Sequence, residues 1–129
     1  MVIHLDADLA VTLQEDRPGT LARALGCVSA AGINIDGYAE IGGVVHLLSQ
    51  DLRATHDALQ EAGFRIVQET RVVVVSVADE AGAAARVFQR IAEAHINIKY
   101  SYLATRNRLV IAADDLNAVR EALKGVVEP

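Results

Sequence analysis

One five-residue stretch, Asp16 to Thr20, combines residue types that suit a ligand-binding turn. It lies between an apolar run that ends at Leu13 and an amphipathic pattern that begins at Leu21. Its proline suits the first turn of a helix, and its glycine lets backbone approach a ligand closely. The N–H groups at a helix start attract an anion such as a carboxylate. The stretch therefore predicts an anion-binding turn, and a helix start that binds nothing is the alternative.

The other reactive residues form no catalytic or metal-binding pattern. The histidines show no metal-ligand spacing and fall on different expected elements; they are His4, His46, His56 and His95. Cys27 has no base or orienting group near it in the sequence, so we expect a structural thiol rather than a nucleophile. The acids between Asp6 and Asp16 are explained more simply as a solvated rim than as a catalytic pair. We therefore expect no catalytic residue, no metal and no cofactor.

Composition narrows the class of protein and the partners. A chain of 129 residues, with 52% hydrophobic and 22% charged residues, is one ordinary folded domain or two very small ones. The net charge of −5, without a basic face, argues against nucleic acid or an anionic membrane as partner. We find no apolar run of about 18 residues that could span a bilayer and no signal peptide. Since the single Cys27 cannot form an internal disulfide, we expect a cytoplasmic protein.

The first half of the chain predicts the order strand, helix, strand, strand, helix. The expected elements are strands at 1–7 and 9–14, which can be continuous, a helix at 20–31, strands from 33 and over 44–48, and a helix from 52 to 62. Gly32 and Gly63 stand where left-handed helix caps are wanted, and Gly42-Gly43 marks a hairpin turn. Asp51 can cap the second helix.

The second half repeats the first. After one long strand signal over 64–77, Asp79 and Gly82 repeat Asp16 and Gly19 at an offset of 63 positions. Arg23 and Arg86 match at the same offset, and the Ile-Asn-Ile of 33–35 recurs at 96–98. One extra residue in the second hairpin, over 105–108, makes the later offset 64. We therefore predict two repeats, at 1–63 and 64–129.

The repeat frame leaves the second copy without a closing strand. Residues 2–6 can cross over and supply it, or they can extend the first strand and leave a three-stranded second sheet. With the crossover, each copy has the order βαββαβ, which favours an antiparallel four-stranded sheet with two helices on one face. The run Val72 to Val75 does not alternate, so we expect it to be buried on both faces. The fold class is α+β.

Three stretches together resemble the ACT domain family, in particular its stand-alone tandem members: Gln14 to Ala22, Ala30 to Ile35, and Asp57 to Phe64. The resemblance covers essentially the whole chain. It implies two ferredoxin-like βαββαβ repeats with helices on one face of each sheet. It also implies units that pair side by side, with a small ligand, usually an amino acid, between the first loop of one unit and the second strand of its neighbour.

Carried over to this chain, the resemblance implies a set of ligand-binding residues. They are Gln14, Asp16, Arg17, Pro18, Gly19, Thr20, Leu21, Asn34 and Asn97. Backbone N–H groups from Gly19 to Leu21 would bind the α-carboxylate of an amino acid. Asp16 or an asparagine side-chain oxygen would accept the α-ammonium.

The second copy departs from this pattern. It has lost the arginine and the proline of the first loop, and Glu80 places a negative charge at the helix start. Val77 replaces Gln14, and His95 replaces Gly32 at a helix end. We therefore expect the first loop to carry the site, facing Asn97 or Asn34 of a second chain.

The function that follows is a non-catalytic regulatory sensor of a small molecule such as an amino acid, which acts as a homodimer on an unknown regulated enzyme. A purely structural oligomerisation module is one alternative. An acyl-phosphate hydrolase on the same fold, with Arg17 and Asn34 at the phosphate, is the less favoured one.

Overall fold

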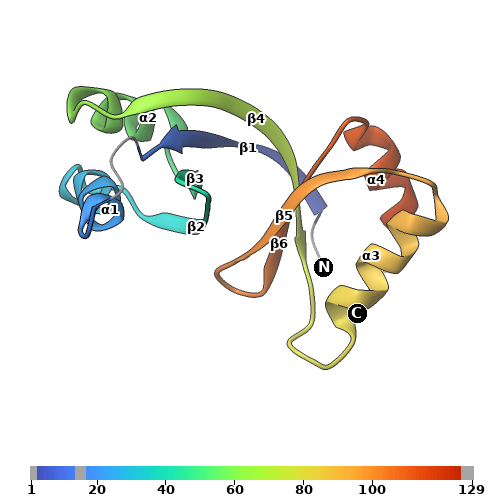
Figure 1. Ribbon diagram of the computed structural model, residues 1–129. Coiled ribbons are helices and arrows are strands. Elements are labelled where there is room, and N and C mark those ends of the chain that lie inside the picture. The colour runs from blue at the N-terminus through green and yellow to red at the C-terminus, as the bar shows by residue number, and fades with distance from the viewer. Residues whose placement is uncertain (1–2, 14–16, 126–129) are drawn as a thin grey trace. The chain divides into compact units, whose positions relative to one another are not determined.

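The computed structural model describes residues 3–13 and 17–125 (Figure 1). The described chain follows the order β1 (Ile3–Thr12), α1 (Thr20–Ala30), β2 (Ile35–Ile41), β3 (Val44–Ser49), α2 (Leu52–Glu61), β4 (Arg65–Ser76), α3 (Ala83–Glu93), β5 (Ile98–Ala104), β6 (Arg108–Ala113) and α4 (Leu116–Leu123). It divides into two compact units. We call Ala7–Thr70 the inner unit, and Met1–Asp6 together with Arg71–Pro129 the split unit.

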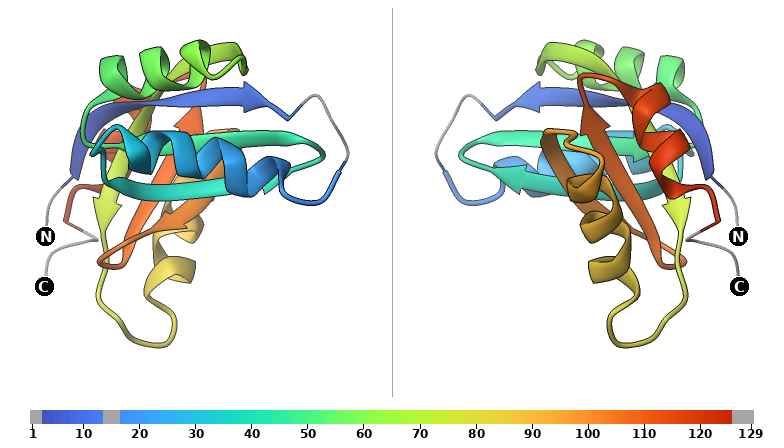
Figure 2. Two further views of the ribbon diagram at one scale, coloured as in Figure 1. Left: turned by 90° about the vertical axis from the view of Figure 1, so that its left-hand side faces the viewer. Right: turned by 90° about the vertical axis from the view of Figure 1, so that its right-hand side faces the viewer.

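The inner unit is one βαββαβ structure with the strand order β2-β3-β1-β4. The β2–β3 hairpin closes through two glycines with positive φ, 59° at Gly42 and 83° at Gly43, as a tight hairpin turn requires. Helices α1 and α2 cover one face of its strands (Figure 2). Alternate residues of β1, Leu9 and Val11, enter its core with Val28 of α1. The period of two in the strand and the apolar stripe of the helix therefore meet in one core.

The split unit has the same architecture but takes its last strand from the start of the chain. Its strand order is β1-β4-β6-β5, with Ile3–Asp6 as the outermost part. Ile3 and Leu5 pack against the core that Val73 of β4 and Ile91 of α3 help to form. Helices α3 and α4 cover one face (Figure 2). Residues near the N-terminus thus complete a unit whose other elements follow residue 70.

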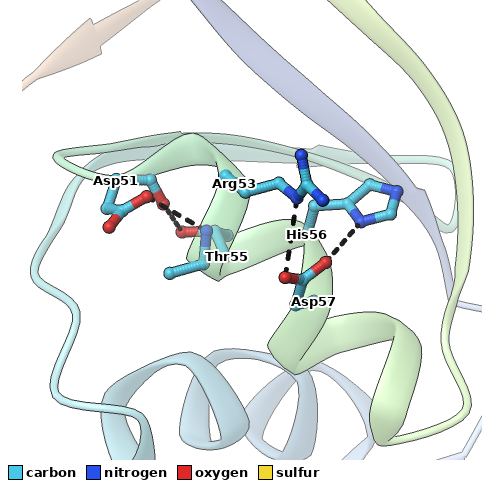
Figure 3. Close-up of polar contacts among 6 residues, drawn as sticks. Asp51, Arg53, Thr55, His56 and Asp57 are labelled. Atoms are coloured by element: carbon cyan, nitrogen blue, oxygen red, sulfur yellow. Dashed lines mark hydrogen bonds and ion pairs between the residues drawn. The ribbon is translucent and has the colours of Figure 1, made fainter.

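Most of the expected local features are confirmed. The two strands expected before residue 14 are one continuous strand, β1. Asp51 caps α2, since its carboxylate accepts the N–H of Ala54 at 3.0 Å (Figure 3). His95 has the left-handed φ of 59° that its place at a helix end demands. Val72 to Val75 are all buried. The boundaries of the two sequence repeats, 1–63 and 64–129, stay a prediction. The compact units of the structure are divided at other residues.

Candidate functional site

The first loop enters α1 through a left-handed glycine. Gly19 has φ 92° and ψ −9°, and among the described residues no side chain caps the helix. The N–H of Arg23 donates to the Gly19 carbonyl at 2.9 Å, which starts the helical ladder. The Thr20 hydroxyl and N–H both point back to the Arg17 carbonyl, at 3.2 and 3.4 Å. These hydrogen bonds hold residues 17–20 in a tight turn directly before α1.

The second loop has almost the same backbone. Gly82, the counterpart of Gly19, has φ 86° and ψ −8° at the start of α3. The N–H of Arg86 donates to the Gly82 carbonyl at 3.0 Å, and that of Ala83 donates to the Glu80 carbonyl at 3.3 Å. Any difference in binding between the two loops must therefore come from their side chains.

At one loop position the two side chains have opposite charges. In the split unit, Glu80 lies at the loop position that Arg17 occupies in the inner unit, and its Oε1 is 2.9 Å from Nη2 of Arg86. The counterpart of Arg86 in the inner unit is Arg23, whose guanidinium contacts Phe64. Its guanidinium carbon lies 4.4 Å from the ring centroid of Phe64. The second loop thus contains an acid paired with a cation, whereas the first has an arginine at the position of that acid.

The entrances to the second strand of each unit also differ in charge, but in the opposite sense to the loops. In the inner unit, the amide nitrogen of Asn34 donates to Oδ1 of the buried Asp36 at 3.3 Å. In the split unit, Lys99 stands in place of Asp36, and its Nζ pairs with Oδ1 of Asp114 at 3.2 Å. The inner unit therefore combines an arginine at this loop position with an acidic strand entrance, and the split unit combines a glutamate at the matching loop position with a lysine at that entrance.

Not all of the predicted site residues come together. Arg17 to Leu21 lie at the start of α1, whereas Asn34 follows its end, and a helix of 11 residues is about 16 Å long. In Figure 2, the loop before α1 and the segment after α1 lie at opposite ends of this helix. Asn97 is an exposed residue of the split unit. Leu21 packs against the core, so only its backbone is suited to a ligand. Gln14 and Asp16 lie outside the described residues.

Sequence reasoning missed two contributors to this arrangement. In the sequence, Arg23 stands out only as a repeat match, and Asp36 only as part of the strand that begins at residue 33. The signal for Asp36 was present, since the repeat offset aligns it with a lysine and so reveals a reversal of charge. The contact of Arg23 with Phe64 cannot be predicted from the sequence, because the β2–β3 hairpin and α2 lie between the two residues along the chain.

The remaining reactive groups look structural. Burial raises the pKa of the Cys27 thiol, and the charge of Arg23 only partly opposes this. The Cys27 thiol donates to the Ala24 carbonyl at 3.1 Å. Within residues 3–13 and 17–125, no group of three or more His, Cys, Asp or Glu side chains could hold a metal ion. None of the described helices is long and apolar enough to cross a membrane.

Comparison with known proteins adds the fold family. No protein-family model and no curated protein matches the chain. Among solved structures, protein BT0572 from Bacteroides thetaiotaomicron superposes with a TM-score of 0.80 at 25% identity, over 95% of this chain and 88% of that one. The regulatory subunit of aspartate kinase from Thermus thermophilus superposes with a TM-score of 0.62 at 20% identity, over 95% and 97%.

These similar structures are tandem ACT-domain proteins. This chain has the tandem ACT-domain fold. Its two ACT units are the inner and the split unit, and the expected α+β class with ferredoxin-like repeats is confirmed. E. coli aspartokinase III, in complex with lysine and aspartate, also superposes, with a TM-score of 0.63 at 18% identity. The superposition covers 99% of this chain but only 33% of that enzyme.

Proposed function

We propose that this ACT-fold chain is a non-catalytic regulatory module that binds an amino acid at the first loop of its inner unit. The observation that carries the proposal is the contrast between two loops with the same backbone. The first leads through Gly19 to a helix start without a side-chain cap among the described residues, and it carries Arg17. The second carries Glu80, which already holds Arg86. A helix start and an arginine both favour a carboxylate ligand.

The α-ammonium of such a ligand needs an acceptor from elsewhere. Asn34 and Asp36 form an acidic strand entrance, but α1 separates them from the loop of their own unit. We propose that the strand entrance of a second unit, carrying Asn34 or Asn97, faces the first loop, and that Asn34 suits the α-ammonium better because Asp36 lies beside it, whereas Lys99 follows Asn97. The regulated partner is then controlled by the difference in ligand affinity between two arrangements of the units.

The similar structures support a regulatory role rather than catalysis. One is a regulatory subunit of aspartate kinase, and aspartokinase III was solved with lysine and aspartate. The alternative role as an acyl-phosphate hydrolase requires Arg17 and Asn34 at one phosphate. The length of α1, about 16 Å, keeps these two residues apart within one unit.

A thermal-shift screen of the twenty amino acids tests the proposal. A ligand at 100 times its Kd stabilises the folded state by about 2.7 kcal/mol, which raises Tm by several degrees in a chain of this size. We expect this shift to vanish in Arg17→Ala and to persist in Glu80→Ala, the matched change in the second loop. A flat screen, followed by no binding heat in calorimetry, would favour the purely structural module instead.

A further inference from the structure

Two adjoining hollows lie between α2 and the first half of β4, within the inner unit. They hold about 510 and 550 Å³, inside the range of about 300–1,000 Å³ of small-molecule sites. Both are open to solvent, and both are lined by His56, Gln60 and Glu69. Neither is lined by a described residue of the first loop or of a strand entrance. The hollows are therefore separate from the proposed amino-acid site.

The three side chains that line both hollows offer hydrogen-bond acceptors. Nδ1 of His56 lies 3.3 Å from Oδ1 of Asp57, and since a carboxylate only accepts, this nitrogen carries a proton. Nε2 of the neutral ring is then an acceptor, and Figure 3 shows it on the side away from Asp57. Gln60 adds an amide oxygen and Glu69 a carboxylate, and neither side chain bonds to another described residue. These acceptors are available to a ligand.

Charge and burial favour a cation with an apolar body. One hollow is lined by two carboxylates, of Asp57 and Glu69, and by one guanidinium, of Arg53, so its formal charge is negative. Nε of Arg53 is 3.6 Å from Oδ2 of Asp57, which leaves the charge of Glu69 unbalanced there. The adjoining hollow has an apolar floor, to which the buried Phe64 and the half-buried Ile66 contribute. An ammonium therefore suits the first hollow, and a carbon skeleton suits the second.

An anionic ligand finds less support. Arg65 lines the second hollow, but it shares that lining with Glu69, so its charge is balanced there. A free amino acid would bring its carboxylate close to Glu69 as well. An amine without a carboxylate avoids this repulsion.

The split unit has cations at the matching positions. At the offset of 64, Arg120 stands in place of His56, and Lys124 stands in place of Gln60. Nζ of Lys124 already pairs with Oε1 of Glu121 at 2.8 Å. The ACT fold therefore does not require uncharged acceptors at this place, and they are a property of the inner unit.

The structure assigns these hollows as a binding site for an organic amine with an apolar body. The ammonium donates to His56 Nε2, to the Gln60 amide oxygen and to the Glu69 carboxylate. The carbon skeleton covers Phe64 and Ile66. The site does not depend on ligand binding at the first loop, so the proposed function can fail while this site stands, and the reverse also holds.

A titration with phenethylamine tests the site, followed by heteronuclear NMR of the nitrogen-labelled protein. We expect saturable shifts at the amides of α2 and of residues 65–69, and none at Gly19 or Thr20. Phenethyl alcohol and phenylacetate have a similar body without the ammonium, and they should bind at least about tenfold more weakly, because hydrogen bonds to a charged group are the stronger ones. Equal binding of the alcohol and the amine, shifts confined to the first loop, or no saturable shift would each overturn the proposal.

Matched variants test the named side chains. Glu69→Gln should raise the Kd for phenethylamine about tenfold, since it removes the unbalanced charge. Glu61→Gln is the control, because the exposed Glu61 of α2 lines neither hollow, and it should change the Kd by less than about twofold through a screened charge.

The double variant H56R/Q60K copies the split unit and should abolish saturable binding, because two cations then replace two acceptors. Arg17→Ala should leave the amine Kd unchanged, which separates this site from the first loop. Circular dichroism checks that each variant is folded. Equal effects of Glu61→Gln and Glu69→Gln, or retained binding by the double variant, would contradict the assignment.

Discussion

The guanidinium of Arg23 lies over the ring of Phe64, with 4.4 Å between its central carbon and the ring centroid. Its Nη1 also donates to the Ala62 carbonyl, at 3.5 Å, at the C-terminal end of α2. One side chain of α1 thus contacts both the end of α2 and the residue that leads into β4. Arg86, at the same repeat position, instead pairs with Glu80 in its own loop.

This contrast predicts unequal effects of matched substitutions. Arg23→Ala removes a cation–π contact on a buried ring, worth about 0.5–2 kcal/mol, and we expect a loss of unfolding free energy in that range. Arg86→Ala removes an exposed ion pair, whose contribution is about 0–1 kcal/mol. Urea denaturation followed by circular dichroism measures both. A larger loss for Arg86→Ala than for Arg23→Ala would show that the Phe64 contact contributes little.

The sequence predicted the elements well because their signals are local. The cap at Asp51, the hairpin glycines and the left-handed His95 each depend on a few neighbouring residues. The contact between Arg23 and Ala62 joins residues 39 positions apart. It depends on how α1 docks on α2, which periodicity does not encode. The repeat supplied one long-range inference, that residues 2–6 can close the second copy, because a missing strand is visible by comparison.

The two loop glycines predict a backbone effect that is separable from binding. Gly19 and Gly82 have φ of 92° and 86°, where an alanine costs about 1–2 kcal/mol. A Cβ at Gly19 meets nothing within 4 Å, while one at Gly82 meets only the flexible end of Arg86, at 3.3 Å. We therefore expect Gly19→Ala and Gly82→Ala to destabilise the protein about equally in urea. Only Gly19→Ala should weaken the ligand shift.

Gly26 provides the control for that pair. It lies inside α1, has no positive φ, and a Cβ there meets nothing within 4 Å. Gly26→Ala should stabilise the protein by about 0.5–1 kcal/mol, since glycine is a poor helix former. A destabilised Gly26→Ala variant would mean that losses at the loop glycines cannot be assigned to φ.

The Cys27 thiol predicts a pH dependence of chemical reactivity. Burial raises its pKa above the ordinary 9.0, so less of the reactive thiolate is present at any pH below that value. We expect iodoacetamide to alkylate the native protein more slowly than the urea-unfolded protein at pH 8. The rate should keep rising above pH 9. Because the charge of Arg23 lowers this pKa, Arg23→Ala should slow the reaction further. Equal native and unfolded rates would contradict the burial effect.

The last prediction compares two ways of filling the same place in the fold. In the inner unit, the buried hydroxyls of Ser49 and Thr55 lie 2.7 Å apart. The Thr55 hydroxyl also donates to the Asp51 carbonyl at 2.8 Å, as Figure 3 shows. At the matching offset of 64, the split unit has Ala113 and Val119, both buried. One unit therefore uses a hydrogen-bonded pair where the other uses an apolar pair.

Thr55→Val alone leaves the buried Ser49 hydroxyl without this partner, which costs about 1–3 kcal/mol. The double variant S49A/T55V copies the apolar pair of the split unit, so we expect it to be more stable than Thr55→Val despite carrying one more change. Urea denaturation of the wild type, both single variants and the double variant closes a double-mutant cycle. Strictly additive losses of unfolding free energy would show that the two hydroxyls do not depend on each other. In that case the apolar pair of the split unit could not replace the hydrogen-bonded pair of the inner unit.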